Sequence, residues 1–201
     1  MISDFQKIID KEQIKEYPLK HYEGDIVVVN TLEKLQEVFP VISNCSICGI
    51  DTETLPCFKK GGKQNPIALI QIATHESVYL IRLNKIGYHP LIGYFFENPY
   101  FCKVGIAIND DIKKLNHYGK INPKNIVDLN AYCKQLGFES IGAKKLSALV
   151  LGFIISKKQQ TSNWENDELT KAQILYAATD AWICREIYLK LQSQIPQKKI
   201  I

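Results

Sequence analysis

The chain has 201 residues, and 46% of them are hydrophobic, which is enough for one large domain with a sizeable core. Its 25 Lys and Arg residues outnumber 21 Asp and Glu residues, and the net charge of +4 permits a polyanionic partner without requiring one. No apolar run reaches the roughly 18 residues that a membrane-spanning helix needs, and the charged N-terminal stretch lacks the apolar centre of a signal peptide. We therefore expect a soluble, cytoplasmic protein with no membrane partner.

The elements that we expect follow a simple order along the chain. Residues 1–24 precede the main domain as a short helix and a loop, the domain spans residues 25–195, and residues 196–201 form a tail. Strands are expected where β-branched and apolar residues cluster, at residues 25–29, 46–52, 67–73, 77–82, 101–108 and 125–130. Helices are expected where apolar residues recur at helical spacing, at residues 31–42, 89–98, 109–119, 129–137, 143–152 and 169–195. Thr31 is expected as the N-cap of the first of these helices, and Thr170 opens the last.

The connections between these elements predict an α/β fold. The four-residue sequence THES between two apolar strands is short enough for a hairpin, so the strands at 46–52, 67–73 and 77–82 form an antiparallel meander. Strands and helices alternate after residue 83, which is typical of parallel units with right-handed crossovers. We therefore expect a mixed central sheet of five or six strands with helices on both faces.

The six cysteines include one C-x-x-C pair, Cys45 and Cys48. A zinc site needs a second pair or histidines at ligand spacing, and the sequence offers neither. A redox C-x-x-C usually opens a helix, whereas this one leads into a strand. We interpret both residues as reduced cysteines of the core or of a loop.

Two carboxylates stand at the end of the apolar strand in SICGIDTETLP, residues 46–56. Side chains at positions i and i+2 of a strand point to the same face, so Asp51 and Glu53 lie close together. Like charges at this separation repel unless a cation compensates them. Acid pairs of this kind are also common on solvated strand ends, so the pair alone does not establish a metal site.

Carboxylates recur at three further places. Asp110 and Asp111 follow the strand at 101–108, and the helix after it has Asn109 or Asp110 as its N-cap. The two acids either cap that helix or point into a site at the sheet edge, and both hold if Asp110 caps and Asp111 points into the site. Tyr176 and Asp180 are four residues apart on the long C-terminal helix and share one face of it.

Asp128 ends another strand, and we interpret it as the N-cap of the helix that follows, with an outer part of the site as the alternative. Asp51, Glu53, Asp111 and Asp180 then make four carboxylates on three elements. Oxygen ligands of this number suit two divalent cations, Mg²⁺ or Mn²⁺.

Several segments occur in an order that resembles a known family. They are GIDTET (49–54), NPIALIQIAT (65–74), VYLIRL (78–83), KVGIAINDDIKKL (103–115), VDLNAY (127–132) and SNWENDELTKAQILYAATDAW (162–182). Together they are similar to the DEDDy-type 3′-5′ exonucleases, which include ribonuclease D, the proofreading domain of DNA polymerase I and the Werner syndrome exonuclease domain. The resemblance covers roughly residues 25–192 and implies a ribonuclease H-like fold.

The resemblance also implies roles for individual residues. Asp51 and Glu53 match the metal ligands of the family's first motif, and Asp180 matches the ligand of its third motif. Asp111 matches the ligand of the second motif, with Asp110 as the alternative. Tyr176 matches the tyrosine that orients the attacking water. The implied reaction is metal-dependent hydrolysis of nucleic acid from a free 3′ end, releasing nucleoside 5′-monophosphates.

Substrate contacts are less specific in the sequence. We assign substrate binding to Thr52 and to two aromatic residues, Phe58 and Trp164, although core or loop packing is the alternative for both rings. Lysines that can reach phosphates are Lys59, Lys60, Lys63, Lys113 and Lys114, with a solvated surface as their alternative role. We favour DNA as the substrate. The alternatives are an RNA exonuclease of ribonuclease D type and a non-catalytic nucleic-acid-binding relative.

Overall fold

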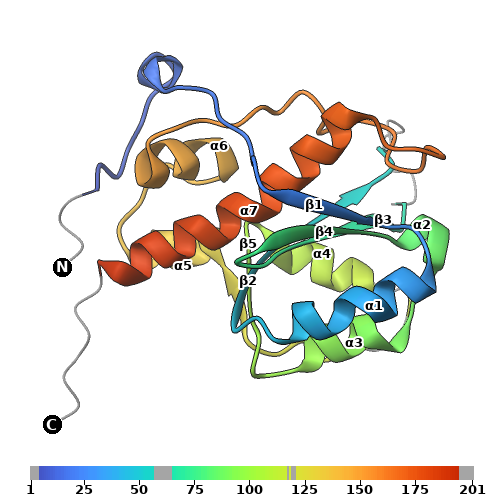
Figure 1. The fold of residues 1–201 in the computed structure, drawn as a ribbon. Coiled ribbons are helices and arrows are strands. Elements are labelled where there is room, and N and C mark those ends of the chain that lie inside the picture. The colour runs from blue at the N-terminus through green and yellow to red at the C-terminus, as the bar shows by residue number, and fades with distance from the viewer. Residues whose placement is uncertain (1–4, 57–64, 117, 119–120, 195–201) are drawn as a thin grey trace, which may run out of the picture.

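A computed structural model describes residues 5–56, 65–116, 118 and 121–194 of the chain (Figure 1). Its centre is a six-stranded sheet in the order β1-β4-β3-β2-β5-β6. The strands are β1 (Asp25–Val29), β2 (Ile47–Thr54), β3 (Ile67–Ala73), β4 (Ser77–Arg82), β5 (Cys102–Gly105) and β6 (Ile126–Asp128). The predicted mixed sheet is therefore confirmed, with six strands.

The predicted meander is also present. Strand β3 pairs antiparallel with both β2 and β4, and the β3–β4 hairpin closes through the backbone bond from Thr74 N to Ser77 O. Strand β1 runs parallel to β4, and β5 runs parallel to both β2 and β6. Strand β2 thus lies near the middle of the sheet, where β5 pairs with its first three residues and β3 pairs with it from Gly49 to Thr54.

Helices cover both faces of this sheet (Figure 1). They are α1 (Leu32–Ser43), α2 (Leu83–Ile86), α3 (Pro90–Glu97), α4 (Ile108–Leu115), α5 (Leu129–Gln135), α6 (Ala143–Leu146), the π-helical turn η2 (Ser147–Leu151) and α7 (Lys171–Ser193). Helices α1, α3 and α4 share one apolar core with the sheet, and α7 packs across the opposite face. None of the helices in the described part of the chain has the length and apolar character to cross a membrane.

The predicted helix starts are confirmed at three positions. The Thr31 side chain accepts a hydrogen bond from Lys34 N at the start of α1, and Asp128 accepts from two backbone amides at the start of α5. Thr170 begins α7 with a capping box, because its side chain and that of Gln173 each accept from the other residue's backbone. Before β1, the described helical part is the short 3₁₀ helix η1 (Gln13–Glu16).

The segment between β5 and α4 also differs from the prediction. The strand ends at Gly105 rather than at residue 108, and α4 begins at Ile108. Its N-cap is Ala107, in the left-handed region at φ 58°, so neither Asn109 nor Asp110 caps the helix. Asp110 and Asp111 instead lie in the first turn, where the partial positive charge of the helix end favours acidic side chains.

The C-x-x-C pair is part of the core. Cys45 and Cys48 are both buried and free, and the Cys45 thiol donates to Ile47 O. Burial raises the pKa of the Cys48 thiol, which keeps it protonated. The interpretation of the pair as reduced structural cysteines agrees with this arrangement.

One glycine decides how closely α7 approaches the sheet. Cys48 and Ile50 of β2 point into the core beneath α1 and α3, so Gly49 and Asp51 face α7. A Cβ on Gly49 would lie 2.8 Å from the Arg185 backbone nitrogen and would also clash with the Ala181 carbonyl oxygen. The absence of a side chain at residue 49 therefore lets α7 rest directly on β2, one turn from the acids described below.

Candidate active site

Three carboxylates meet where α7 crosses the end of β2. Asp51, Glu53 and Asp180 each place a carboxylate oxygen within 4.8 Å of the others. Asp51 is half-buried, Glu53 is 9% exposed and Asp180 is 3% exposed. The strand spacing of two and the close approach of α7 at Gly49 are the local causes of this arrangement.

The cluster is electrostatically unfavourable without a cation. Burial, followed by the charges of Asp180 and Asp111, raises the pKa of Asp51 well above its ordinary value. Burial, followed by the charge of Asp51, raises the pKa of Glu53 to about 10. Burial likewise raises the pKa of Asp180. Three desolvated acids in one place indicate a site built around positive charge.

Tyr176 lies one turn of α7 before Asp180 and is 6% exposed. Its hydroxyl is hydrogen-bonded to the Asp180 carboxylate, and burial together with nearby acids raises the tyrosine pKa, so the hydroxyl stays protonated. The structure thus brings Tyr176 and Asp180 together with the β2 acids, as the sequence predicted. A protonated hydroxyl at this place is able to donate to or hold a water molecule.

Lys157 is a member of the site that we did not predict from the sequence. Its ammonium donates to both Asp180 carboxylate oxygens at 3.3 Å and lies 5.6 Å from the centre of the Tyr176 ring. It stands in the polar loop before α7, where two adjacent lysines gave no periodic signal. The positive charge nearest to the acids therefore comes from a loop rather than from a strand or helix.

Asp111 lies beside the three-acid cluster rather than within it. Its carboxylate accepts from Lys114 at 3.0 Å, and its charge contributes to the raised pKa of Asp51 and of Glu53. Asp110 is 79% exposed and pairs with Lys113 at 2.8 Å. Of the two candidates in this motif, the geometry favours Asp111.

The predicted substrate residues have different environments. Trp164 is fully buried, and its ring centre is 5.9 Å from that of Tyr176, so it supports the tyrosine from below and is not accessible to a nucleotide. This corrects the assignment of Trp164 to substrate binding and agrees with the alternative, which was packing in the core. Thr52 lines the site, and its backbone amide donates to Asp51 at 2.9 Å. Phe58 and the lysines at 59, 60 and 63 lie outside the described residues.

The acids open into a cavity of about 320 Å³. Asn130, Gln160 and the backbone around Gly142 line its far side, and none of these was predicted. Asn130 accepts from the Gly142 amide at 2.9 Å, which holds the wall formed by α5 and α6 in place. No sequence pattern identifies these residues, because they come from separate elements that only the fold brings together.

The donor set at this cavity fits hard divalent cations. The carboxylates of Asp51, Glu53 and Asp180 provide oxygen atoms, which Mg²⁺ and Mn²⁺ prefer. Cys184 also lines the cavity, but its thiol donates to Asp180 O at 3.1 Å and burial raises its pKa well above the ordinary value. The thiol therefore remains protonated and does not add a soft ligand.

Comparison with known proteins agrees with this geometry. The 3′-5′ exonuclease family profile matches residues 26–196. A 3′-5′ exonuclease of Acanthamoeba polyphaga mimivirus is 38% identical over 163 residues, which cover 73% of this chain and 40% of that protein. DNA polymerase I of Aquifex aeolicus is 30% identical over 172 residues, covering 85% of this chain and 28% of the polymerase. The chain thus spans less than half of either relative.

A solved structure shows the same fold. The exonuclease domain of Nibbler from Aedes aegypti superposes with a TM-score of 0.77 at 24% identity, covering 91% of this chain and 94% of that domain. The ribonuclease H-like fold is therefore confirmed. Because the family profile spans most of the sequence and a relative is 38% identical, the chain belongs to the 3′-5′ exonuclease family, in the DEDDy-type group that its motifs indicated.

Proposed function

We propose that the chain hydrolyses nucleic acid from a free 3′ end and releases nucleoside 5′-monophosphates. The observation that carries the proposal is the buried cluster of Asp51, Glu53 and Asp180, with the Tyr176 hydroxyl on Asp180. In the reaction, the oxygen of a water attacks the last phosphorus, the bond from phosphorus to the 3′ oxygen breaks, and a proton passes to that oxygen. The products are a shortened strand with a 3′ hydroxyl and one nucleotide with a 5′-phosphate.

The residues have distinct tasks in this scheme. Asp51, Glu53 and Asp180 would hold two divalent cations, Mg²⁺ or Mn²⁺, with Asp111 completing the set from α4. When bound, such cations lower the pKa of a water and stabilise negative charge on the phosphate. Tyr176 positions the attacking water through its hydroxyl, and the buried Trp164 ring fixes the tyrosine in place.

Lys157 and Lys114 balance charge in this scheme. Each binds one of the acids, Asp180 and Asp111 respectively, through its ammonium. A cation held by these acids would compensate their charge, and the Lys157 ammonium would then be available to contact a substrate phosphate at the cavity. Thr52 and Phe58 are proposed as further substrate contacts at the end of β2.

DNA is the proposed substrate, and the similarity to a DNA polymerase supports it. RNA is the second candidate, because a site built from carboxylates and a tyrosine acts on a phosphodiester and does not itself distinguish the sugar. Neither the charge nor the cavity favours one polymer, so the substrate is decided by experiment.

The experiment uses 5′-labelled single-stranded DNA, recessed duplex DNA and matched RNA, each with Mg²⁺, Mn²⁺ or EDTA. We expect a ladder that shortens from the 3′ end with either cation and none with EDTA. DNA is expected to be degraded faster than RNA, and the reverse ranking would assign the chain to RNA. Binding of the strands without any cation-dependent ladder would identify a non-catalytic relative and refute the proposal.

Substitutions assign the individual roles. Tyr176→Phe keeps the ring and removes the hydroxyl, so we expect kcat to fall by about 100-fold with cation binding retained. Asp111→Ala is expected to abolish the ladder, and Asp110→Ala is the matched control that keeps it. The opposite result for these two variants would show that Asp110 is the catalytic acid.

A further inference from the structure

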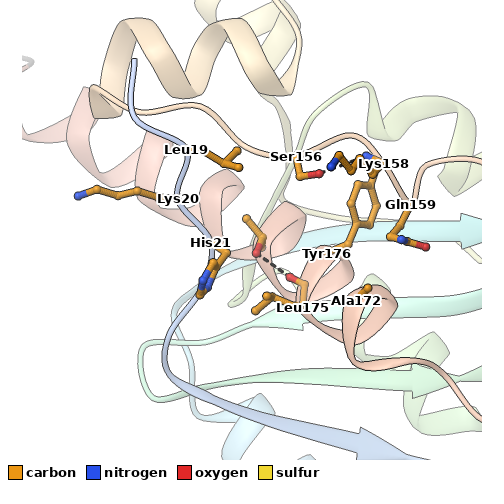
Figure 2. A pocket seen from close by; sticks show the side chains of 10 residues that line it. Leu19, Lys20, His21, Ser156, Lys158, Gln159, Ala172, Leu175 and Tyr176 are labelled. Atoms are coloured by element: carbon orange, nitrogen blue, oxygen red, sulfur yellow. Dashed lines mark hydrogen bonds between the residues drawn. The ribbon is translucent and has the colours of Figure 1, made fainter. Parts of the chain in front are cut away.

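A second cavity of about 190 Å³ lies against the outer face of α7 (Figure 2). Three segments that are distant in sequence form it: the N-terminal segment 19–21, the loop 156–159 and the exposed side of the first two turns of α7. Tyr176 borders both this cavity and the acidic one. We name the second cavity the α7 pocket.

The α7 pocket is held open by backbone contacts. Lys20 N donates to Ile154 O, and Ile154 N donates to Pro18 O, both at 2.9 Å. Tyr22 N donates to Thr179 Oγ1 at 3.0 Å, which attaches the same segment to α7. Because these bonds fix all three walls relative to one another, a ligand enters a site that is already formed.

The walls of the α7 pocket are mainly apolar. Leu19, Ala172 and Leu175 contribute aliphatic surface, and Figure 2 shows Leu19 on the N-terminal segment across from Tyr176, with Ala172 and Leu175 on α7. Leu19 is 65% exposed. The volume is below the roughly 300 Å³ of an ordinary small-molecule site, so it suits a single ring system rather than a whole nucleotide.

The rim of the α7 pocket is basic. Lys158 and His21 line it, and none of the described residues around it is acidic. Lys20 belongs to the same segment and extends away from the pocket in Figure 2, with its ammonium 5.6 Å from the centre of the Phe153 ring. An apolar interior with a basic rim complements an aromatic group that is attached to a phosphate.

The loop before α7 links the two cavities. Lys157 faces the acids, whereas the next two residues, Lys158 and Gln159, line the α7 pocket. A phosphate at the acids therefore lies across the Tyr176 side chain from the α7 pocket. The sugars on either side of such a phosphate carry bases, and a base is the aromatic group of the strand that the apolar walls of the α7 pocket would accept.

We infer that the α7 pocket binds one base of the last two nucleotides of the substrate strand. The inference rests on the proposed function, because it requires the scissile phosphate to occupy the acidic cavity. The N-terminal segment that completes the pocket precedes the part of the chain that matches the exonuclease family, which begins at residue 26.

The test compares substrates that lack a single base at the terminal or the penultimate position. For the wild-type chain, we expect loss of the bound base to raise KM by about 5- to 100-fold, the range that corresponds to one base stacked on an aromatic ring. Of the terminal and penultimate bases, loss of the one that does not occupy the α7 pocket is expected to change KM by less. Equal KM values for the intact strand and both abasic strands would overturn the inference, provided that the intact strand is cleaved.

Two pocket variants make the test specific. Ala172→Trp fills the pocket and is expected to raise KM for the intact strand, with no further increase on the abasic one. Leu19→Asp adds a negative charge at an exposed position and gives the same result without strain on the fold. Ser193→Trp places the same ring at the exposed far end of α7 and serves as the control, with wild-type KM.

A binding measurement separates this inference from the proposed function. In substrate strands, 2-aminopurine replaces the base whose loss raised KM most, and its fluorescence is recorded with bound protein in EDTA. If the chain cleaves no strand, 2-aminopurine is placed at the terminal and the penultimate position in separate strands. We expect quenching with the wild-type chain and with Ser193→Trp, and its loss with Ala172→Trp and Leu19→Asp. Quenching without cleavage would support base binding in the α7 pocket and refute the exonuclease activity. Cleavage with the same fluorescence in all variants would refute base binding in the α7 pocket and leave the exonuclease activity supported.

Discussion

The substitution Gly49→Ala tests how the fold positions the acids. The new Cβ would lie 2.8 Å from the Arg185 backbone nitrogen and 3.1 Å from the Ala181 carbonyl carbon, and it would clash with the Ala181 oxygen. Real Cβ atoms essentially never approach other heavy atoms within 3.0 Å, and these neighbours are helix backbone that has no rotamer to change. Helix α7 must therefore move away from β2.

The expected effect follows from that displacement. Relief of the clash requires a shift on the order of 1 Å, and a shift of this size at a catalytic group costs about 100-fold in rate. Asp180 lies next to Ala181, so its carboxylate moves relative to Asp51 and Glu53. Overpacking of this kind also lowers the free energy of unfolding by about 1–3 kcal/mol.

The assay measures kcat for release of the 3′ nucleotide from single-stranded DNA, with urea unfolding recorded on the same preparations. Gly87→Ala is the control, because Gly87 has a φ of +69° and no atom within 4 Å of an added Cβ. Alanine there costs about 1–3 kcal/mol of stability through backbone strain alone, because a φ of 69° with a ψ of −172° is a conformation that essentially only glycine adopts. If Gly49→Ala and Gly87→Ala had the same kcat, the argument that residue 49 sets the position of α7 would be wrong.

Three other predictions concern charge and polar burial. In EDTA, urea unfolding should show a stability that decreases from pH 5.5 to 7.5, because the pKa of Glu53 is raised to about 10 and the folded chain retains protons that the unfolded chain has released. This window lies below the titration of Lys103, whose pKa burial lowers to about 8, and a stability that increased across it would contradict the raised carboxylate pKa values. Lys157→Ala should lower the free energy of unfolding in EDTA by about 1 kcal/mol, a small value because the lysine is partly exposed, and Lys158→Ala should leave that free energy unchanged. Equal losses in the two variants would show that the ion pair between Lys157 and Asp180 does not stabilise the fold. Gln71→Leu should raise the free energy of unfolding by about 1 kcal/mol, since both polar atoms of the buried Gln71 amide lack a partner among the described residues, and a lower stability would indicate a hydrogen bond in solution.

Much of the candidate site was predictable because its geometry is local. The i, i+2 spacing of Asp51 and Glu53 places both on one face of a strand, and the i, i+4 spacing of Tyr176 and Asp180 places both on one face of a helix. These periodicities are properties of the backbone and hold whatever surrounds it. Six strands, the meander and three helix caps were predictable for the same reason.

The features that the sequence did not predict depend on contacts between distant segments. Trp164 stands in a polar loop, and its aromatic ring is of the kind that stacks on bases, but the loop folds so that the ring is buried against Tyr176. Lys157 becomes part of the site only because that loop returns to Asp180. Ala107 begins α4 in a left-handed conformation, which no residue preference predicts for alanine.

The most direct test of the central claim is a Mn²⁺ titration followed by electron paramagnetic resonance, with cleavage measured at each concentration. Asp51→Asn removes one of the clustered charges with little change in shape, and Asp110→Asn is the exposed control. We predict two Mn²⁺ ions per wild-type chain and per Asp110→Asn chain, with cleavage rising as the sites fill. Asp51→Asn should lose at least one ion and all cleavage. If it bound two ions and cleaved DNA like the wild type, the cluster on β2 and α7 would not be the active site.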